Sequence, residues 1–177
     1  MGRVRFSIVV AALAVVMPFE AAAQTYATPR TQFPLEITRA DNALDQTISI
    51  VENRVYEVAL LFLFGDQAER NRISALIGDG SRFPSGRMGS PGVAIPIRFR
   101  ISSKTESATG HFYLEGTALT EGTSAFRSDV YVRTVVKVRL PPGIYRIQTW
   151  TVRDLPEFAG IGTHLEIGFD PRAKPYR

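Results

Sequence analysis

Apolar and polar side chains alternate along most of the chain after residue 24. The alternation is clearest in two stretches, residues 95–101 and 132–140. The charged positions between their apolar residues are Arg98, Arg100, Arg133, Lys137 and Arg139. A period of two places every second side chain on the same face of a strand. Both stretches therefore predict half-buried antiparallel strands that direct these charges outward.

Six further stretches have the composition of strands. They are residues 33–38, 47–51, 55–64, 112–119, 145–152 and 164–169. The stretch 55–64 is apolar on both faces over its second half, which is typical of a central strand. Pro96 has no backbone N–H, so we expect its strand to lie at a sheet edge, at least at that end. About eight short strands predict an all-β fold, a single immunoglobulin-like antiparallel β-sandwich.

One segment carries helical signals instead. Asp66 followed three residues later by Glu69 has the spacing of a capping box, and Gly78 stands where a left-handed cap would end the helix. We therefore expect one short helix over residues 67–77, connecting two strands. The stretch that follows, "GDGSRFPSGRMGSPG" at residues 78–92, predicts a long loop.

The stretch "RLPPGIYRIQTW", residues 139–150, joins two of the predicted strands. Pro142 and Gly143 suit the central positions of a type II turn, which does not match the twist of a tight hairpin. Tyr145 stands where β-sandwiches place a tyrosine whose hydroxyl binds the backbone just upstream. We therefore favour a corner at which the chain passes from one sheet to the other, with Leu140 anchoring its first side. A plain hairpin is the alternative.

Several motifs follow one another in an order that resembles a known family. They are "VYEVALLFLF", a glycine-bearing helix and loop, "VAIPIRFRI" and "VVKVRLPPGIYRIQTWTVRDLPEFAGIGTHLEIGF". Together they are similar to small exported bacterial β-sandwich proteins grouped as a domain of unknown function, over most of residues 33–170. Many members of that family are lipoproteins, whereas this chain has no cysteine to carry a lipid. The resemblance implies the fold and brings no catalytic residue with it.

The first residues predict export. Arg3 and Arg5 precede an apolar run from residue 6 to residue 19, and three alanines end the segment at residue 23. Such a run is too short to span a bilayer, so we interpret residues 1–23 as a cleaved signal peptide and expect no transmembrane segment in the mature chain. Residues 24–32 would form an N-terminal arm and residues 33–177 the sandwich domain. We expect a periplasmic or secreted protein without a lipid anchor.

Charge alone names no partner. The first 23 residues hold two arginines and one glutamate, so their removal lowers the formal charge from +4 to +3, which gives no argument for nucleic acid. More informative is a set of outward positions that neighbouring strands would gather into one basic stripe: Arg98, Arg100, Arg133, Lys137, Arg139, Arg146 and Arg153, with Trp150 and Tyr131 nearby. Such a stripe would suit a protein partner or an anionic envelope component. An ordinary solvated sheet surface is the alternative.

No arrangement of residues predicts catalysis, a metal site or a cofactor. His111 and His164 are far apart in the sequence, and a metal site would need both together with carboxylates. No G-x-S-x-G turn is present. We therefore expect a non-catalytic binding or interaction module of the cell envelope, which docks or neutralises a protein partner. A structural or adhesive subunit that uses residues 24–32 in assembly is the alternative, and a hydrolytic enzyme is the third interpretation.

Overall fold

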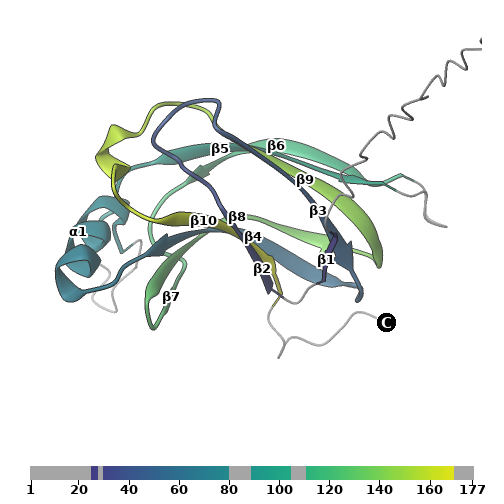
Figure 1. Cartoon of the computed structure of the whole chain (residues 1–177), viewed down its shortest axis with the longest axis horizontal. Helices are drawn as coiled ribbons and strands as arrows, with labels where there is room; N and C mark the ends of the chain where they lie inside the picture. The colour runs from purple at the N-terminus through teal and green to yellow at the C-terminus, as the bar shows by residue number, and fades with distance from the viewer. Residues whose placement is uncertain (1–24, 28–29, 80–88, 105–110, 170–177) are drawn as a thin grey trace, which may run out of the picture.

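Two five-stranded sheets face each other in the computed structural model, which describes residues 25–27, 30–79, 89–104 and 111–169 (Figure 1). The expected all-β sandwich with one short α-helix is confirmed, and the described ranges hold ten strands where about eight were expected. The expected signal segment, residues 1–23, and residues 80–88 of the expected loop lie outside the described residues.

The first sheet has the order β1-β3-β9-β5-β6. Its strands are β1 (Thr25–Ala27), β3 (Ala43–Ile50), β9 (Gly143–Thr151), β5 (Ile95–Ser103) and β6 (Tyr113–Thr120). Neighbouring strands are antiparallel, except that β1 runs parallel to β3. The three residues of β1 are too few to show a period, which is why the sequence did not predict this strand.

The second sheet has the order β2-β10-β4-β8-β7, with antiparallel pairs throughout. Its strands are β2 (Arg30–Pro34), β10 (Thr163–Gly168), β4 (Arg54–Leu63), β8 (Val130–Leu140) and β7 (Ala125–Arg127). Residues 30–32, which we expected in a separate N-terminal arm, form the start of β2 and pair with β10.

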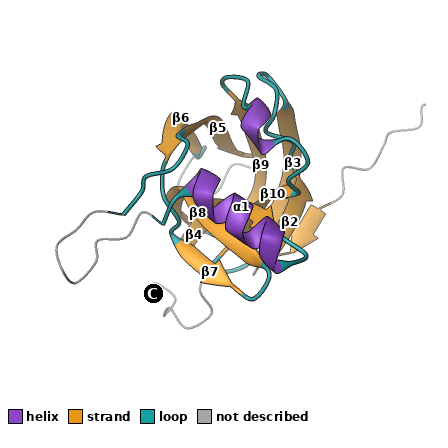
Figure 2. Ribbon diagram, turned by 90° about the vertical axis from the view of Figure 1, so that its left-hand side faces the viewer, coloured by secondary structure: helices purple, strands orange, loops and turns teal. Residues whose placement is uncertain are grey.

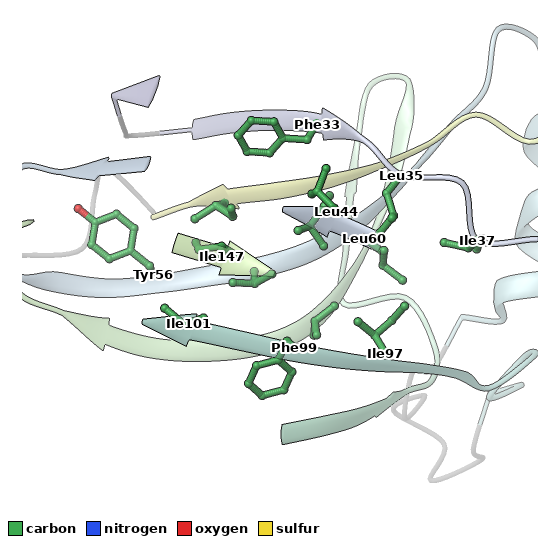
Figure 3. Close-up of a cluster of buried hydrophobic side chains, with 14 of the residues drawn as sticks. Phe33, Leu35, Ile37, Leu44, Tyr56, Leu60, Ile97, Phe99, Ile101 and Ile147 are labelled. Carbon is green, nitrogen blue, oxygen red and sulfur yellow. The ribbon is translucent and has the colours of Figure 1, made fainter. Parts of the chain in front are cut away.

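The core fills the space between the sheets. Tyr56 and Leu60 on β4 point into it from the second sheet, and Ile97 and Ile101 on β5 and Ile147 on β9 point into it from the first (Figure 3). All five are almost completely buried. Strands β5 and β9 thus place every second side chain in the core, which is the arrangement that the sequence alternation predicted.

Pro96 does not mark an edge strand, contrary to the expectation. Its strand β5 lies between β9 and β6. The pairing of β5 with β9 begins at Ile97, one residue later, and toward that side the Pro96 carbonyl accepts a hydrogen bond from Val152 N at 3.2 Å. The missing N–H therefore falls where the ladder ends, and an internal strand tolerates the proline there.

The helix α1 (Gln67–Ile77) has the bounds that the sequence predicted. The Asp66 carboxylate accepts from Glu69 N at 2.8 Å, and the Glu69 carboxylate accepts from Gly65 N at 2.7 Å. Ile73 and Ile77 form its buried side. The helix lies at one end of the sandwich, where a single 3₁₀ turn, η1 (Pro156–Phe158), also lies (Figure 2).

Residues 140–145 carry the chain from one sheet to the other. Leu140 ends β8 in the second sheet, and Gly143 begins β9 in the first. The Tyr145 hydroxyl donates to the Pro141 carbonyl at 2.9 Å, four residues upstream, and its ring is buried. The expected type II turn is wrong, because the φ of Gly143 is 159° rather than about +80°. Gly143 instead pairs with Ile50 as a strand residue, and Pro142 lies exposed between the two strands.

Replacing Tyr145 with Phe should lower the free energy of unfolding by about 1–2 kcal/mol, because the Pro141 carbonyl loses its donor while the ring still packs. Equilibrium urea unfolding measures the change. Tyr113→Phe is the matched control: its hydroxyl also donates a hydrogen bond, to Glu115, but at the surface, where water can replace the lost donor, so the change should be close to neutral. A change below about 0.3 kcal/mol for Tyr145→Phe would show that the corner gains nothing from this hydrogen bond.

Candidate binding surface

The basic positions predicted from the sequence do not form one stripe. Strands β8 and β9 belong to different sheets, so residues that we expected side by side lie on opposite faces of the molecule. On the outward face of the first sheet lie Arg98, Arg100, Arg146 and Trp150. Lys137 and Arg139 are exposed on the second sheet, and Arg133 is buried inside.

The sequence predicted an outward position for Arg133, and this prediction is wrong because of an irregularity in β8. Val58 on β4 pairs with Val136, and Ala59 pairs with Thr134, so Val135 is an extra residue in the ladder. Such a β-bulge changes which face the following side chains occupy. Lys137 keeps the outward direction that alternation predicted, whereas Arg133, on the other side of the bulge, turns inward and is only 1% exposed.

Arg133 makes its hydrogen bonds inside the molecule, to the backbone carbonyls of four residues. Its guanidinium donates to the carbonyls of Val93 at 2.6 Å and Thr120 at 3.2 Å. It also donates to the carbonyl of Ile77, at the end of α1, and to that of Pro91 at 3.3 Å. Burial lowers the pKa of Arg133 to about 10, with the charge of Glu121 acting in the opposite direction, so the side chain remains a cation at neutral pH.

Trp150 lies on the outward face of the first sheet, near the end of its middle strand, β9. Across the β5–β9 pair it is directly opposite Arg98. The guanidinium carbons of Arg98 and Arg100 lie 5.9 Å and 5.6 Å from the Trp150 ring centroid, within the range of cation–π contacts. We call Trp150, Arg98, Arg100, Glu115 and Tyr113 the Trp150 face.

Glu115 on β6 holds both arginines in place. Its carboxylate accepts from Arg98 Nε and from Arg100 Nε, each at 3.1 Å, and also from the Tyr113 hydroxyl. The hydrogen bonds from Tyr113 and Arg98 are the main causes that lower the pKa of Glu115 to about 2. The Trp150 face is therefore an ordered array of aromatic and arginine groups at neutral pH.

A third ion pair lies beside this face. Arg146 on β9 pairs with Asp45 on β3, with Arg146 Nε donating at 2.9 Å, and Gln148 donates to the same carboxylate at 3.0 Å. The hydrogen bond from Arg146 is the main cause of the lowered pKa of Asp45. Because three arginines meet two carboxylates here, the surface is close to electrical balance and is not the strongly basic stripe that the sequence suggested.

An open pocket adjoins the Trp150 face at the end of the sheet. It has a volume of about 250 Å³ and is lined by Asp41, Arg98, Trp150, Thr151 and Val152. The side chains of Val152 and Trp150 make one part of this pocket apolar, whereas Asp41 and Arg98 supply opposite charges. A partner that binds the face has a recess to fill at this end.

The sequence did not predict a polar cluster on the outer face of the second sheet. Glu166 on β10 is only 4% exposed. Arg127 from β7 donates to both of its carboxylate oxygens at 2.8 Å, Arg30 from β2 donates at 3.1 Å, and Gln32 donates at 2.9 Å. The cluster links the two edge strands of the sheet. It was missed because β7 has only three residues and gives no periodic signal.

The histidines do not come together. His111 lies 3.4 Å from Ser103 on the first sheet, measured from Nδ1 to Oγ, and His164 lies on β10 in the second sheet. Among the described residues, no three His, Asp or Glu side chains are placed to hold a metal ion. Within the same ranges, no helix is long and apolar enough to cross a membrane.

A family model matches residues 32–169, from within β2 to the residue after β10. Its description is a domain of unknown function, DUF5625. The chain belongs to the DUF5625 family. The resemblance to a family of unknown function, expected from the strand and corner motifs, is thereby confirmed. No curated protein matches this DUF5625 chain.

The DUF5625 sandwich is similar to the crystal structure of a protein from Sulfurospirillum deleyianum. The two structures superpose with a TM-score of 0.64 and share 18% sequence identity. The alignment covers 81% of this chain and 98% of that chain. At this sequence identity the structural similarity shows only that the two proteins share a fold.

Proposed function

We propose that this DUF5625 protein is a non-catalytic binding module and that a protein partner docks on the Trp150 face. The observation that carries the proposal is the contact of Trp150 with two arginines that Glu115 holds in place. Tryptophan, tyrosine and arginine are the residues most enriched at the energetic centres of protein interfaces. Side chains that are already ordered lose little conformational entropy when a partner binds.

The balance of charge favours a protein over an anionic polymer as the partner. Arg98 and Arg100 share Glu115, and Arg146 is paired with Asp45. Binding to a polyanion depends on unpaired cations that release its counterions. Paired arginines beside an aromatic ring suit a partner that offers backbone carbonyls, a carboxylate and an apolar side chain for the adjoining pocket.

We further propose that the protein acts in the periplasm or after secretion, following removal of residues 1–23. The support is the basic start, the short apolar run and the alanines before Gln24. Mass spectrometry of the chain recovered from the cell envelope should give a mature N-terminus near Gln24. A chain that keeps Met1 or Gly2 would contradict export by cleavage.

Capture from envelope extracts tests the binding surface. A chain with Trp150→Ala and Arg98→Ser should retain a partner at least about 10-fold less well than the original chain, because loss of such central residues costs about 2 kcal/mol or more. Lys137→Ser with Arg139→Ser is the matched control, since it removes two exposed cations from the opposite sheet. Equal capture by all three chains would contradict the proposed surface, and unfolding curves would show that each is folded.

A further inference from the structure

Strand β6 is the free edge of the first sheet. It pairs with β5 on one side, and within the described part of the chain no strand pairs with its other side (Figure 2). It has eight residues, whereas the other edge strands, β1, β7 and β2, have three, three and five. Long unpaired edges are the sites at which a second chain adds to a sheet.

The direction of each backbone group along β6 follows from its pairing with β5. Ser103 N donates to the Phe112 carbonyl at 2.9 Å, and directly opposed residues of an antiparallel pair alternate between bonded and non-bonded. Leu114, Gly116 and Ala118 thus direct their N–H and C=O groups toward β5. The residues whose backbone groups point to the free edge are Tyr113, Glu115, Thr117 and Leu119.

Two of these four edge residues carry large exposed apolar side chains. Tyr113 is 56% exposed and Leu119 is 63% exposed, and both lie on the outward face of the sheet. The single charge in the strand, Glu115, is already paired with Arg98 and Arg100. The strand has no lysine, proline or bulge, which are the features that commonly block pairing at sheet edges.

We propose that β6 pairs antiparallel with β6 of a second copy of this chain, about a two-fold axis at Gly116. In this register Tyr113 lies opposite Leu119 of the second copy, and Glu115 lies opposite Thr117 of the second copy. All four residues direct backbone groups to the free edge, so the pair gains about eight backbone hydrogen bonds. The two most exposed apolar side chains of the strand then cover each other twice, and no like charges face each other directly.

This register is the one that the spacing of the strand selects. Tyr113 and Leu119 are equally distant from Gly116, so a single two-fold axis satisfies both contacts at once. If the register moved by one residue, each residue with edge-directed backbone groups would face a residue whose N–H and C=O point toward β5. The hydrogen bonds between the two copies could then not form. The result is one continuous ten-stranded sheet that carries two Trp150 faces on the same surface. The proposal does not depend on what those faces bind.

Sedimentation analysis of the protein purified from cells that express the full sequence tests the pairing. The original chain should have twice the mass of a single chain. Thr117→Pro should give a single chain with little change in unfolding, because the N–H that it removes points to the free edge and not to β5. Thr117→Val keeps that N–H and should remain a dimer. A single chain at all concentrations, or a Thr117→Pro dimer, would overturn the proposal.

Paired charge substitutions test the register and do not rely on proline. Tyr113→Lys with Leu119→Lys places like charges opposite each other twice and should dissociate the dimer. Tyr113→Lys with Leu119→Glu places opposite charges together twice and should preserve it. Val51→Lys with Val55→Lys removes two other exposed apolar side chains, away from β6 and from the Trp150 face, and should leave the mass of the dimer unchanged. Equal masses for the first two variants would overturn the register at Gly116.

Amide hydrogen exchange gives an independent readout. In the dimer the amides of Tyr113, Glu115, Thr117 and Leu119 should be protected, and in the Thr117→Pro chain those of Tyr113, Glu115 and Leu119 should exchange rapidly. The amides of Leu114, Gly116 and Ala118 bond β5 and should be protected in both. If the chain did not self-associate, and these amides became protected only when a different protein was bound, a second copy would be the wrong partner.

Discussion

Replacing Arg133 with Met should lower the free energy of unfolding by about 3–5 kcal/mol. Ile77 ends α1 and Val93 precedes β5, so their carbonyls lie outside the regular ladders, and the Arg133 guanidinium donates to both. Methionine fills much of the same space but leaves these carbonyls buried without that donor. Equilibrium urea unfolding at neutral pH measures the loss, with the transition midpoint falling and the slope unchanged.

Arg139→Met is the matched control for Arg133→Met. Arg139 is exposed on the same strand, so its replacement should change the free energy of unfolding by less than about 0.5 kcal/mol. Arg133→Lys should fall between the two, because an ammonium group keeps the charge but cannot span four carbonyls with a planar fork. If Arg133→Met were as mild as Arg139→Met, the guanidinium would not be what holds the end of α1 to residues 91–93.

Replacing Glu166 with Gln should lower the free energy of unfolding by about 2–3 kcal/mol at neutral pH. The substitution keeps the shape of the side chain but weakens its hydrogen bonds to Arg127 and Arg30, which then face each other without a negative charge between them. The estimate stays below that of a fully buried pair, because both arginines are partly exposed. Glu52→Gln is the comparison: the Glu52 side chain is 42% exposed, although its partner Arg54 is largely buried, so its replacement should cost clearly less than that of Glu166.

The difference in free energy of unfolding between the original chain and Glu166→Gln should become smaller as the pH falls. Burial raises the pKa of Glu166, but the hydrogen bonds from Arg127 and Gln32 and the nearby positive charges outweigh it, so the pKa is lowered overall. A carboxyl whose folded pKa is lowered stabilises the fold fully above its unfolded value, about 4.3 for glutamate, and this stabilisation is lost as the pH falls through the folded pKa. The cost of Glu166→Gln, measured by urea unfolding, should therefore be constant above about pH 5 and shrink below pH 4. A constant difference at all pH values would show that the carboxylate charge is not the source of the stabilisation.

Alternation predicted strand β5 well and strand β8 only in part, for a reason that lies in the ladder. Along β5 every second residue from Ile95 to Ile101 reaches the core, because that strand has no bulge. In β8 the extra residue Val135 shifts the alternation, and no composition signal in the sequence marks it. An arginine at an alternating polar position was therefore expected at the surface, although it lies in the interior.

The contacts of the Trp150 face could not be predicted from the sequence. The outward direction of Arg98 follows from its own strand, but its contact with Trp150 depends on β5 pairing with β9, and its contact with Glu115 depends on β5 pairing with β6. The order of strands depends on how the whole sheet assembles, and the sequence of a single strand does not determine its neighbours. The same limit explains why Arg127 and Glu166, which come from strands that are not neighbours, were not connected.

Gly78 and Gly92 fix the point at which the chain leaves the end of α1 and returns to it. Both have positive φ, and a side chain on either would collide with backbone atoms at the other. Val93 N donates to the Leu76 carbonyl at 2.7 Å and fastens the returning chain. Because the exit and the return coincide, each doubling of the length between them adds only about 0.6 kcal/mol of loop-closure entropy. Insertions between the two anchors should therefore cost little stability, provided that the two glycines and the Pro91 carbonyl, which accepts from Arg133 and Gly122, keep their places.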